Sequence, residues 1–405
     1  MMPKSTFRWT LVAFALAGAC KDNGPPPIGP PAALVPIAGA LQAAPANTEL
    51  PAPIQLSVRD ANGNVLGAGH VVTFAVVAGG GSITGTSATS DASGTVTAPA
   101  WRLGKSAVPQ TLRATLNAVV QEVGAIVATE YQITVRFWGD PMSMANQLLF
   151  ANAAARISGF LTGDVIDADA RNSNLDLEQE CDITGQPVLN EIIDDVLVFA
   201  SIRSIDGPGN ILGRAGPCLG RETSTGTMIA IGFMEFDSAD LDRLASGGSL
   251  QEVITHEMLH VVGFGTLWNN RALLTGSGTS DPRFTGMQAR QGCAAAGSPV
   301  TCANSVPVEG TGGSGTANAH WRESTFVNEL MTGFIDAGTN PLSAITIASL
   351  ADLGFTVNMA AADTYAVPLG LIRANNMIAS QGWEQIIPMR ALLHPDGRVE
   401  RVRMK

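Results

Sequence analysis

His256, Glu257 and His260 stand close together in one short segment and could form a metal-dependent hydrolytic site. A spacing of four residues places the two histidines on one face of a helix, where both imidazoles can bind the same zinc ion. Glu257 lies one position round the helix, where its carboxylate can accept a proton from a water molecule at the metal. The segment therefore predicts zinc-dependent hydrolysis with Glu257 as the general base.

The surrounding sequence predicts the helix that this site needs. Ser249 followed by Glu252 has the pattern of a capping box, so we expect the helix to begin at this point. Apolar residues then recur at helical spacing and predict a buried stripe. They are Ile254, Met258, Val261 and Val262.

A catalytic zinc site needs a third protein ligand beside two histidines. In the compact metzincin motif the third histidine would stand at position 266, where this chain has threonine. The remaining histidines are His70, in a separate predicted domain, His320, and His394 near the end of the chain. A glutamate ligand is the alternative, with Glu323 and Glu329 nearest.

Three segments resemble the leishmanolysin family of metzincin zinc peptidases: HEMLHVVGFGTLW, then GTANAHWRESTFVNELMTG after a long insertion, and NPLSAITIASLADLGF. The resemblance implies that His256, His260 and His320 bind one Zn²⁺ per chain and that Glu257 is the base. It also implies that Met331 lies in a turn forming an apolar floor beneath the metal. The implied activity is hydrolysis of peptide bonds in proteins, as a metalloendopeptidase.

These motifs lie in residues 131–405, which are expected to form an α+β zinc protease domain of metzincin type. Alternation and apolar runs predict strands at 133–137, 195–205 and 227–234, and a helix at 141–159. The Gly-, Ser- and Thr-rich stretch 275–319 is too long for an ordinary connection and is typical of a functional loop. Beyond Gly354 the only clear signal is a turn at 395–397.

Residues 37–130 predict a separate all-β domain. Ile54, Leu56 and Val58 alternate with polar residues, two later runs do the same, and Asn- and Gly-rich turns separate them. The stretches LSVRDANGN, VTFAVVAGGGSIT and TLRATL resemble bacterial Ig-like domains of the invasin type. The expected fold is a β-sandwich without catalytic residues, in which His70 is structural.

The pattern of the first 36 residues predicts that the protein is exported from the cytoplasm. Lys4 and Arg8 accompany an apolar run at 9–19 that is too short to span a membrane, as in a signal peptide. Cys20 follows in a context that looks like a bacterial lipoprotein cleavage site, so residues 1–20 are the expected signal and Cys20 the lipid attachment point. Residues 21–36, rich in proline and glycine, are expected to form an extended spacer.

The other four cysteines form an even set, which suits disulfides in an oxidising compartment. They are Cys181, Cys218, Cys293 and Cys302. Proximity in sequence favours the pairs Cys181–Cys218 and Cys293–Cys302 among the three possible pairings.

Composition limits the partners of this protein. At 405 residues, with 45% apolar and 15% charged residues, the chain is expected to fold as more than one domain. A formal net charge of −11 argues against nucleic acid as a partner. The expected partners are protein or peptide substrates, a membrane reached through the lipid on Cys20, and a possible surface ligand of the Ig-like domain. The expected location is the bacterial cell envelope, as a lipoprotein, or the medium.

A different class of function is the alternative: a cell-surface adhesin whose protease-like domain is inactive. Retention of His256, Glu257 and His260 together favours the enzyme, because loss of the base would be the simplest route to an inactive domain.

Overall fold

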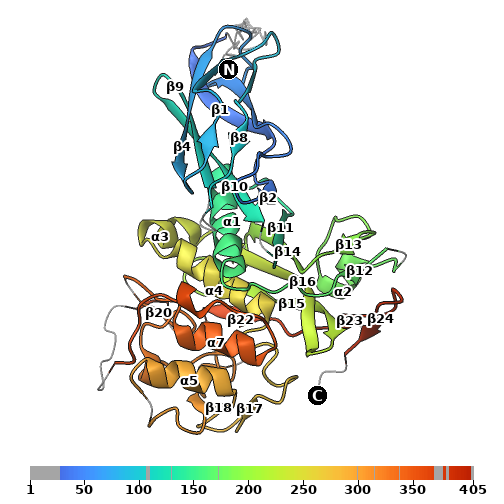
Figure 1. Cartoon of the computed structure of the whole chain (residues 1–405), viewed down its shortest axis with the longest axis vertical. Coiled ribbons are helices and arrows are strands. Elements are labelled where there is room, and N and C mark those ends of the chain that lie inside the picture. The colour runs from blue at the N-terminus through green and yellow to red at the C-terminus, as the bar shows by residue number, and fades with distance from the viewer. Residues whose placement is uncertain are drawn as a thin grey trace, which may run out of the picture.

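The computed structural model describes residues 28–105, 110–128, 130–171, 173–298, 300–313, 315–336, 338–368, 377–379 and 383–402. The predicted signal peptide and Cys20 lie outside this part of the chain. Within it, no helix is long and apolar enough to cross a membrane. Figure 1 shows a β-rich N-terminal region at one end of the molecule and a larger region with helices at the other.

Two sheets form the N-terminal region. One has the order β1 (Pro31–Ala38), β3 (Gln55–Asp60), β7 (Thr95–Thr97). The other has the order β2 (Ala43–Pro45), β10 (Val119–Ala128), β9 (Gln110–Leu116), β4 (Val71–Ala78), β6 (Ser87–Thr89), and β5 (Ser82–Ile83) pairs separately with β8 (Trp101–Arg102). Side chains from both sheets share one hydrophobic core, for example Leu56 and Val72. The predicted all-β region is therefore a two-sheet sandwich.

The start of this sandwich corrects the predicted spacer. Residues 21–36 were expected to form an extended spacer, of which residues 21–27 lie outside the described part of the chain. From Pro31 the expectation is wrong, because Pro31–Ala38 is strand β1, paired antiparallel with β3, and Leu34 is buried in the core. The strand tolerates Pro31 and Pro36 because β1 lies at the edge of its sheet, where one row of N–H groups is not needed for pairing.

A seven-stranded sheet forms the centre of the larger region. Its order is β11 (Ile133–Phe137), β14 (Val196–Arg203), β16 (Gly226–Asp237), β15 (Gly213–Thr223), β23 (Ala391–Leu393), β24 (Val399–Arg401), and β22 (Glu384–Ile386) also pairs with β15. The strands β11, β14 and β16 are parallel, whereas β15 is antiparallel to β16. The predicted strands at 133–137, 195–205 and 227–234 are thus present, and the turn at 395–397 joins β23 to β24.

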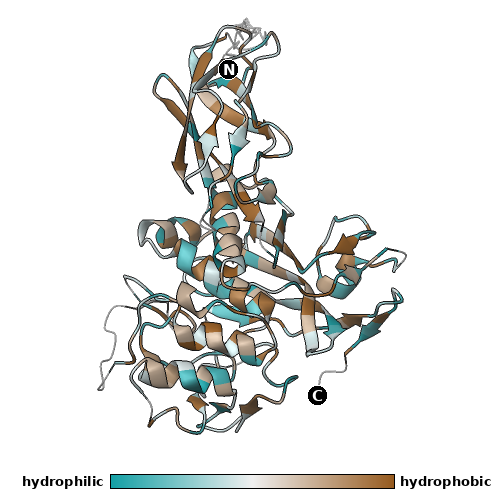
Figure 2. Ribbon diagram, viewed as in Figure 1, coloured by the Kyte–Doolittle hydropathy of each residue, from teal (hydrophilic) through white to brown (hydrophobic). Residues whose placement is uncertain are grey.

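Both faces of the central sheet are buried. Along β14, Val196, Val198 and Ala200 face one core, whereas the intervening Leu197 and Phe199 face another. The first core includes α1 (Met144–Ser158) and α4 (Leu250–Val262), which lie side by side over the sheet (Figure 1). The second includes α2 (Leu177–Cys181) and the short pair β12 (Ala168–Asp169) and β13 (Ile192–Ile193). Apolar residues gather accordingly on the central strands in Figure 2.

The chain after α4 forms a lower lobe of short elements. These are α5 (Met287–Ala295), α6 (Glu323–Phe326), α7 (Ala344–Asp352), the 3-10 turn η1 (Met359–Ala361), the sheet β17 (Leu274–Thr275), β18 (Arg283–Phe284), β19 (Val306–Pro307), and the pair β20 (Ile335–Asp336) and β21 (Met377–Ala379); α3 (Leu241–Ser246) precedes α4. The stretch 275–319 was expected to be a long loop, but it contains α5 and short strands. The helix is stabilised there because α5 buries Ala289 and Cys293 against the core.

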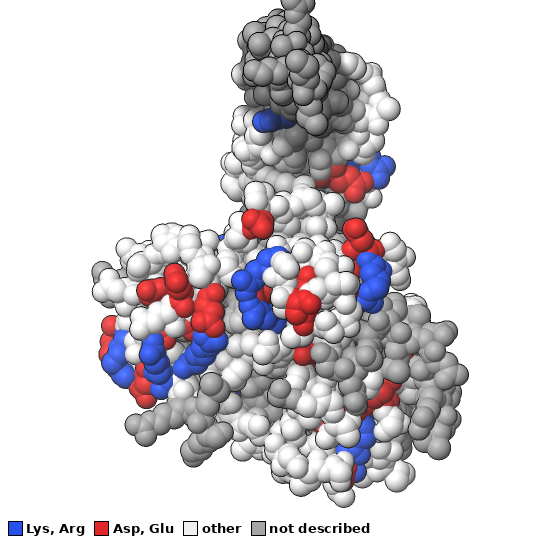
Figure 3. Space-filling view, turned by 180° about the vertical axis from the view of Figure 1, so that it is seen from behind, with Lys and Arg blue, Asp and Glu red and all other residues white. Residues whose placement is uncertain are grey.

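Both predicted disulfides are present. Cys181–Cys218 joins α2 to β15, with the Cα atoms 5.4 Å apart, and Cys293–Cys302 closes the loop after α5, with the Cα atoms 6.0 Å apart. On the face shown in Figure 3, acidic and basic side chains are mixed rather than gathered by sign.

Candidate metal centre

Helix α4 begins where the sequence predicts, but not through the predicted capping box. Ser249 has helical backbone angles (φ −99°, ψ −7°), and its hydroxyl donates to the carbonyl oxygen of Leu244 at 3.4 Å. The carboxylate of Glu252 instead accepts hydrogen bonds from the backbone N–H and side-chain amide of Asn340, at 3.2 and 2.6 Å. Because a capping side chain needs an extended backbone at its own residue, Ser249 cannot act as one here.

The structure brings His256 and His260 of α4 together with His320, which follows 60 positions after His260. Their Nε2 atoms form a nearly equilateral triangle: His256 to His260 3.0 Å, His256 to His320 3.0 Å, and His260 to His320 2.9 Å. All three side chains are fully buried.

The other nitrogen of each ring, Nδ1, is held by a backbone carbonyl oxygen, which fixes the tautomer of the imidazole. Nδ1 of His256 lies 2.7 Å from the carbonyl oxygen of Leu330, that of His260 is 2.9 Å from Phe264 O, and that of His320 is 2.9 Å from Thr316 O. A carbonyl oxygen only accepts, so each Nδ1 carries the hydrogen and donates it. In the neutral rings, each Nε2 therefore directs a lone pair toward the other two.

This donor set fits a zinc ion. Three converging lone pairs repel one another unless a cation or proton lies between them. Tetrahedral ligands at about 2.0–2.1 Å from zinc stand roughly 3.3 Å apart, close to the observed triangle. Burial also lowers the pKa of His260 to about 4, which keeps this imidazole in the neutral form that binds metals.

Glu257 lies in the same buried site with unused hydrogen-bonding capacity. Among the described residues, no N–H or hydroxyl group donates to either of its carboxylate oxygens. Burial, followed by the negative charge of Glu384, raises the pKa of Glu257 well above the usual value for a glutamate. A carboxylate in this environment is basic enough to hold a proton taken from water.

A fourth group, Glu384, lies at the start of β22 and joins the three histidines, although no motif in the sequence indicated it. One oxygen (Oε1) lies 2.7 Å from Nε2 of His320, and the other lies 3.1 Å from Nε2 of His256 and 3.5 Å from that of His260. Burial alone would raise the pKa of Glu384, but the facing His320 and His256 outweigh it and hold the pKa well below the usual value. Glu384 follows 128 positions after His256, in a stretch without a recognisable motif.

The glutamates considered as alternative third ligands lie elsewhere. Glu329 is buried, and its carboxylate accepts hydrogen bonds from the backbone of Met331, the backbone and hydroxyl of Ser343, and the hydroxyl of Thr346. Neither Glu329 nor Glu323 belongs to the group of side chains that converge on the three histidines.

Met331 and the two remaining histidines are placed as follows. Met331 is fully buried and follows Leu330, whose carbonyl oxygen accepts the hydrogen bond from His256. The turn that contains Met331 therefore lies directly against the centre. His70 lies in the sandwich, and His394 pairs with Glu400 at 3.0 Å on the C-terminal hairpin. Neither histidine is part of the cluster.

Residues 192–370 match the model of the leishmanolysin family. That span includes α4, His320 and Met331, and it ends before Glu384. No curated protein matches the chain.

Two solved structures that the chain resembles are fragments of intimin. The D00-D0 domain of intimin is 19% identical, with a TM-score of 0.18, over 24% of this chain and 45% of that one. The D0-D1 domain is 18% identical, with a TM-score of 0.18, over 25% of this chain and 48% of that one. This chain thus spans less than half the length of either structure, and likenesses at this level do not define a fold.

Proposed function

We propose, starting from the leishmanolysin match of residues 192–370, that this chain is a zinc-dependent endopeptidase. The family match supports a metallopeptidase in general. The finer proposal is carried by one observation: three imidazoles, each with its Nδ1–H held by a backbone carbonyl, direct their Nε2 lone pairs to one point. Beside them lies Glu257, whose carboxylate accepts no hydrogen bond from an N–H or hydroxyl group of the described residues.

His256, His260 and His320 would hold the metal. Bound zinc would supply Lewis-acid polarisation of the scissile carbonyl and a lowered pKa for an adjacent water. The three carbonyl acceptors, from Leu330, Phe264 and Thr316, orient the rings, and the turn that contains Met331 supports His256 from the side of Leu330.

Glu257 would be the general base. Its carboxylate would accept a proton from the attacking water and then deliver that proton to the amine that leaves. Both steps need a group whose pKa lies near the working pH, and burial of Glu257 raises its pKa in that direction. The substrates that this chemistry implies are proteins or peptides.

Glu257→Gln tests the proposal, with Glu252→Gln on the same helix as the matched control. Because Glu384 occupies the centre, both substitutions are made in the wild-type chain and in a Glu384→Ala chain. Glu257→Gln should keep one zinc per chain by elemental analysis and lower casein hydrolysis by roughly 10²–10⁴-fold, the usual contribution of a positioned base. Glu252→Gln should leave both unchanged.

Two results would contradict this assignment. Loss of zinc in Glu257→Gln would make Glu257 a metal ligand. Full zinc with no hydrolysis of any unfolded protein, in either background, would favour the adhesin with an inactive protease-like domain.

We also propose that the chain works outside the cytoplasm. The two disulfides indicate an oxidising compartment. Attachment through a lipid on Cys20 stays a prediction from the sequence. Cys20→Ser should move the protein from the membrane fraction to the soluble fraction, and an unchanged distribution would exclude the anchor.

A further inference from the structure

Glu384 gives the metal centre a fourth protein side chain. Its two carboxylate oxygens lie within 2.7–3.5 Å of the three Nε2 atoms, and the side chain is fully buried. Zinc sites with four protein ligands are closed and structural, whereas catalytic sites keep one position open for water or substrate. With Glu384 in this place, the centre is of the closed kind.

The backbone around Glu384 also occupies the strand edge beside the centre. Strand β22 pairs in parallel with β15, Glu384 opposite Gly213 and Ile386 opposite Ala215. The backbone N–H of Leu212 donates to Trp383 O at 2.7 Å, and that of Ile387 donates to Ala215 O at 2.8 Å. Farther along, β23 pairs with β15 at 219–220. An extended peptide that binds by adding a strand to this edge would need the same hydrogen-bonding groups.

The surroundings accommodate this segment closely. A Cβ atom on Gly216 would lie 2.0 Å from the carbonyl oxygen of Ile387, and one on Gly315 would lie 2.2 Å from that of Glu384. Only glycine allows backbone contacts this short. The indole of Trp383 packs against His256, with ring centroids 5.1 Å apart, and its N–H donates to Gly333 O at 3.2 Å.

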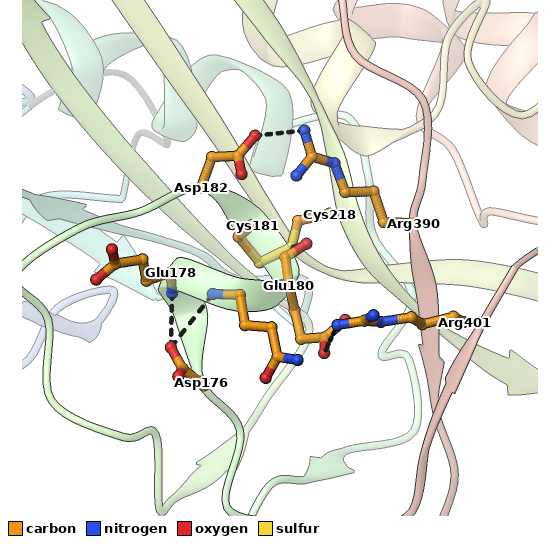
Figure 4. The surroundings of a disulfide bond; sticks show 9 residues. Asp176, Glu178, Glu180, Cys181, Asp182, Cys218, Arg390 and Arg401 are labelled. Carbon is orange, nitrogen blue, oxygen red and sulfur yellow. Dashed lines mark hydrogen bonds and ion pairs between the residues drawn. A yellow bond between two sulfur atoms is a disulfide. The ribbon is translucent and has the colours of Figure 1, made fainter.

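The far end of the segment is fastened by side chains at the surface. Figure 4 shows Arg390 directed to Asp182 and Arg401 directed to Glu180, on either side of the Cys181–Cys218 disulfide. The distances are 2.5 and 2.9 Å. Ion pairs at the surface add little stability because water and salt screen them, so they hold the segment without making it permanent.

We propose that residues 383–393 are a built-in inhibitor of the active site. Glu384 closes the metal centre as a fourth ligand, while β22 and β23 occupy the edge of β15 where substrate would bind. Segment and substrate exclude each other, so hydrolysis requires the segment to leave. This inference rests on the proposed zinc endopeptidase function.

The test compares full-length wild type with Glu384→Ala and Glu384→Gln, the second of which keeps the side-chain volume in case the alanine variant folds poorly. Glu400→Ala is the control, because Glu400 is also a glutamate in the C-terminal strands, but its side chain is exposed and paired with Arg398. Each protein is loaded with Co²⁺, and its visible spectrum is recorded while acetohydroxamate is added. Casein hydrolysis is measured separately on the zinc-loaded proteins.

The expected result is that acetohydroxamate changes the cobalt spectrum of both Glu384 variants at concentrations that leave wild type and Glu400→Ala unchanged. Casein hydrolysis should rise by at least about tenfold in the Glu384 variants, since apparent activity scales with the fraction of molecules whose site is open. Zinc should also pass to a chelator faster once its fourth ligand is gone.

The outcomes separate this inference from the proposed function. Equal acetohydroxamate responses in wild type and the Glu384 variants would overturn the inhibitor, whatever the activity. A response confined to the Glu384 variants, with no hydrolysis by any protein, would uphold closure of the metal centre and overturn the endopeptidase.

Discussion

At the scale of residues, the candidate centre depends on what holds each imidazole as much as on the imidazoles themselves. The three carbonyl acceptors come from the end of α4, from the turn before His320 and from the turn of Met331. Acceptors of this kind set the tautomer and raise the basicity of the metal-binding nitrogen. Two short loops after α4 are therefore as necessary to the site as the helix.

His320→Ala should lower zinc affinity by more than about 100-fold, because loss of a ligand costs more than the 10–100-fold typical of its hydrogen-bonding partner. His394→Ala is the matched control and should bind zinc as the wild type does, since His394 pairs with Glu400 away from the centre. Competition with a chromogenic chelator measures both. Wild-type affinity in His320→Ala would mean that His320 does not bind the metal, and would leave Glu384 as the third protein ligand.

Glu323 should make the stability of the protein depend on pH. Burial, helped by the facing charges of Asp336 and Glu309, raises the pKa of Glu323 from 4.5 to about 7, although a hydrogen bond from Thr332 acts in the opposite direction. The folded state thus holds the proton more tightly than the unfolded state. This contribution to stability is complete below pH 4.5 and is lost as the pH rises through about 7.

Glu323→Gln should remove that part of the pH dependence. Urea unfolding midpoints measured from pH 5 to 8 should fall less steeply for the variant than for the wild type, while zinc content stays at one per chain. A variant whose midpoints follow the wild-type slope would show that Glu323 is not the group responsible.

At the scale of elements, the edge of β15 decides whether the site is covered. The sheet could have ended at this strand, but the C-terminal strands β22, β23 and β24 extend it. β22 and β23 each have three residues, so few backbone hydrogen bonds hold them to β15. A small steric change at that edge should therefore be enough to displace them.

Gly216→Ala should loosen the C-terminal segment, since the added Cβ would lie 2.0 Å from the carbonyl oxygen of Ile387. Amide hydrogen exchange of Ile387 and Arg390, whose N–H groups bond to β15, should accelerate relative to wild type. Gly85→Ala serves as the control, because the nearest atom to its added Cβ is 3.6 Å away. Unchanged exchange in Gly216→Ala would mean that the strand pairing is not sensitive to this contact.

At the scale of the whole molecule, the sandwich and the larger region with the candidate metal centre have separate hydrophobic cores. The first core is built from residues between Leu34 and Val127, and the others begin at Tyr131. Since each core buries its own side chains, the two regions should unfold as separate cooperative units.

Leu56→Ala should destabilise the sandwich by about 2–5 kcal/mol, because Leu56 is completely buried there. Val198→Ala, in the core beneath α4, is the matched change in the other region. Calorimetry should show two transitions, of which each variant lowers one, and zinc content should stay unchanged in Leu56→Ala. A single transition lowered by both variants would mean that the regions unfold together.

The sequence alone determined the local features, because local features follow from neighbouring residues. The period of apolar residues in 249–262 predicted α4, and its His-Glu-His spacing predicted the side chains of the centre. Alternation predicted the strands of the sandwich and the central sheet, and cysteine proximity predicted both disulfides. Resemblance to the leishmanolysin family was needed to select His320, since spacing alone left other candidates open.

Only the tertiary structure decided which distant groups meet. In the first turn of α4, Glu252 accepts a hydrogen bond from Asn340 instead of forming the capping box that the sequence suggested. Pro31–Ala38 pairs at the edge of a sheet, although its prolines predicted a spacer. Glu384 lies far along the chain in a segment without periodicity, and it reaches the histidines because β22 pairs with β15. Whether two distant segments pair as strands depends on an edge that is formed elsewhere in the fold. The spacing of residues within the segment itself therefore cannot predict the pairing.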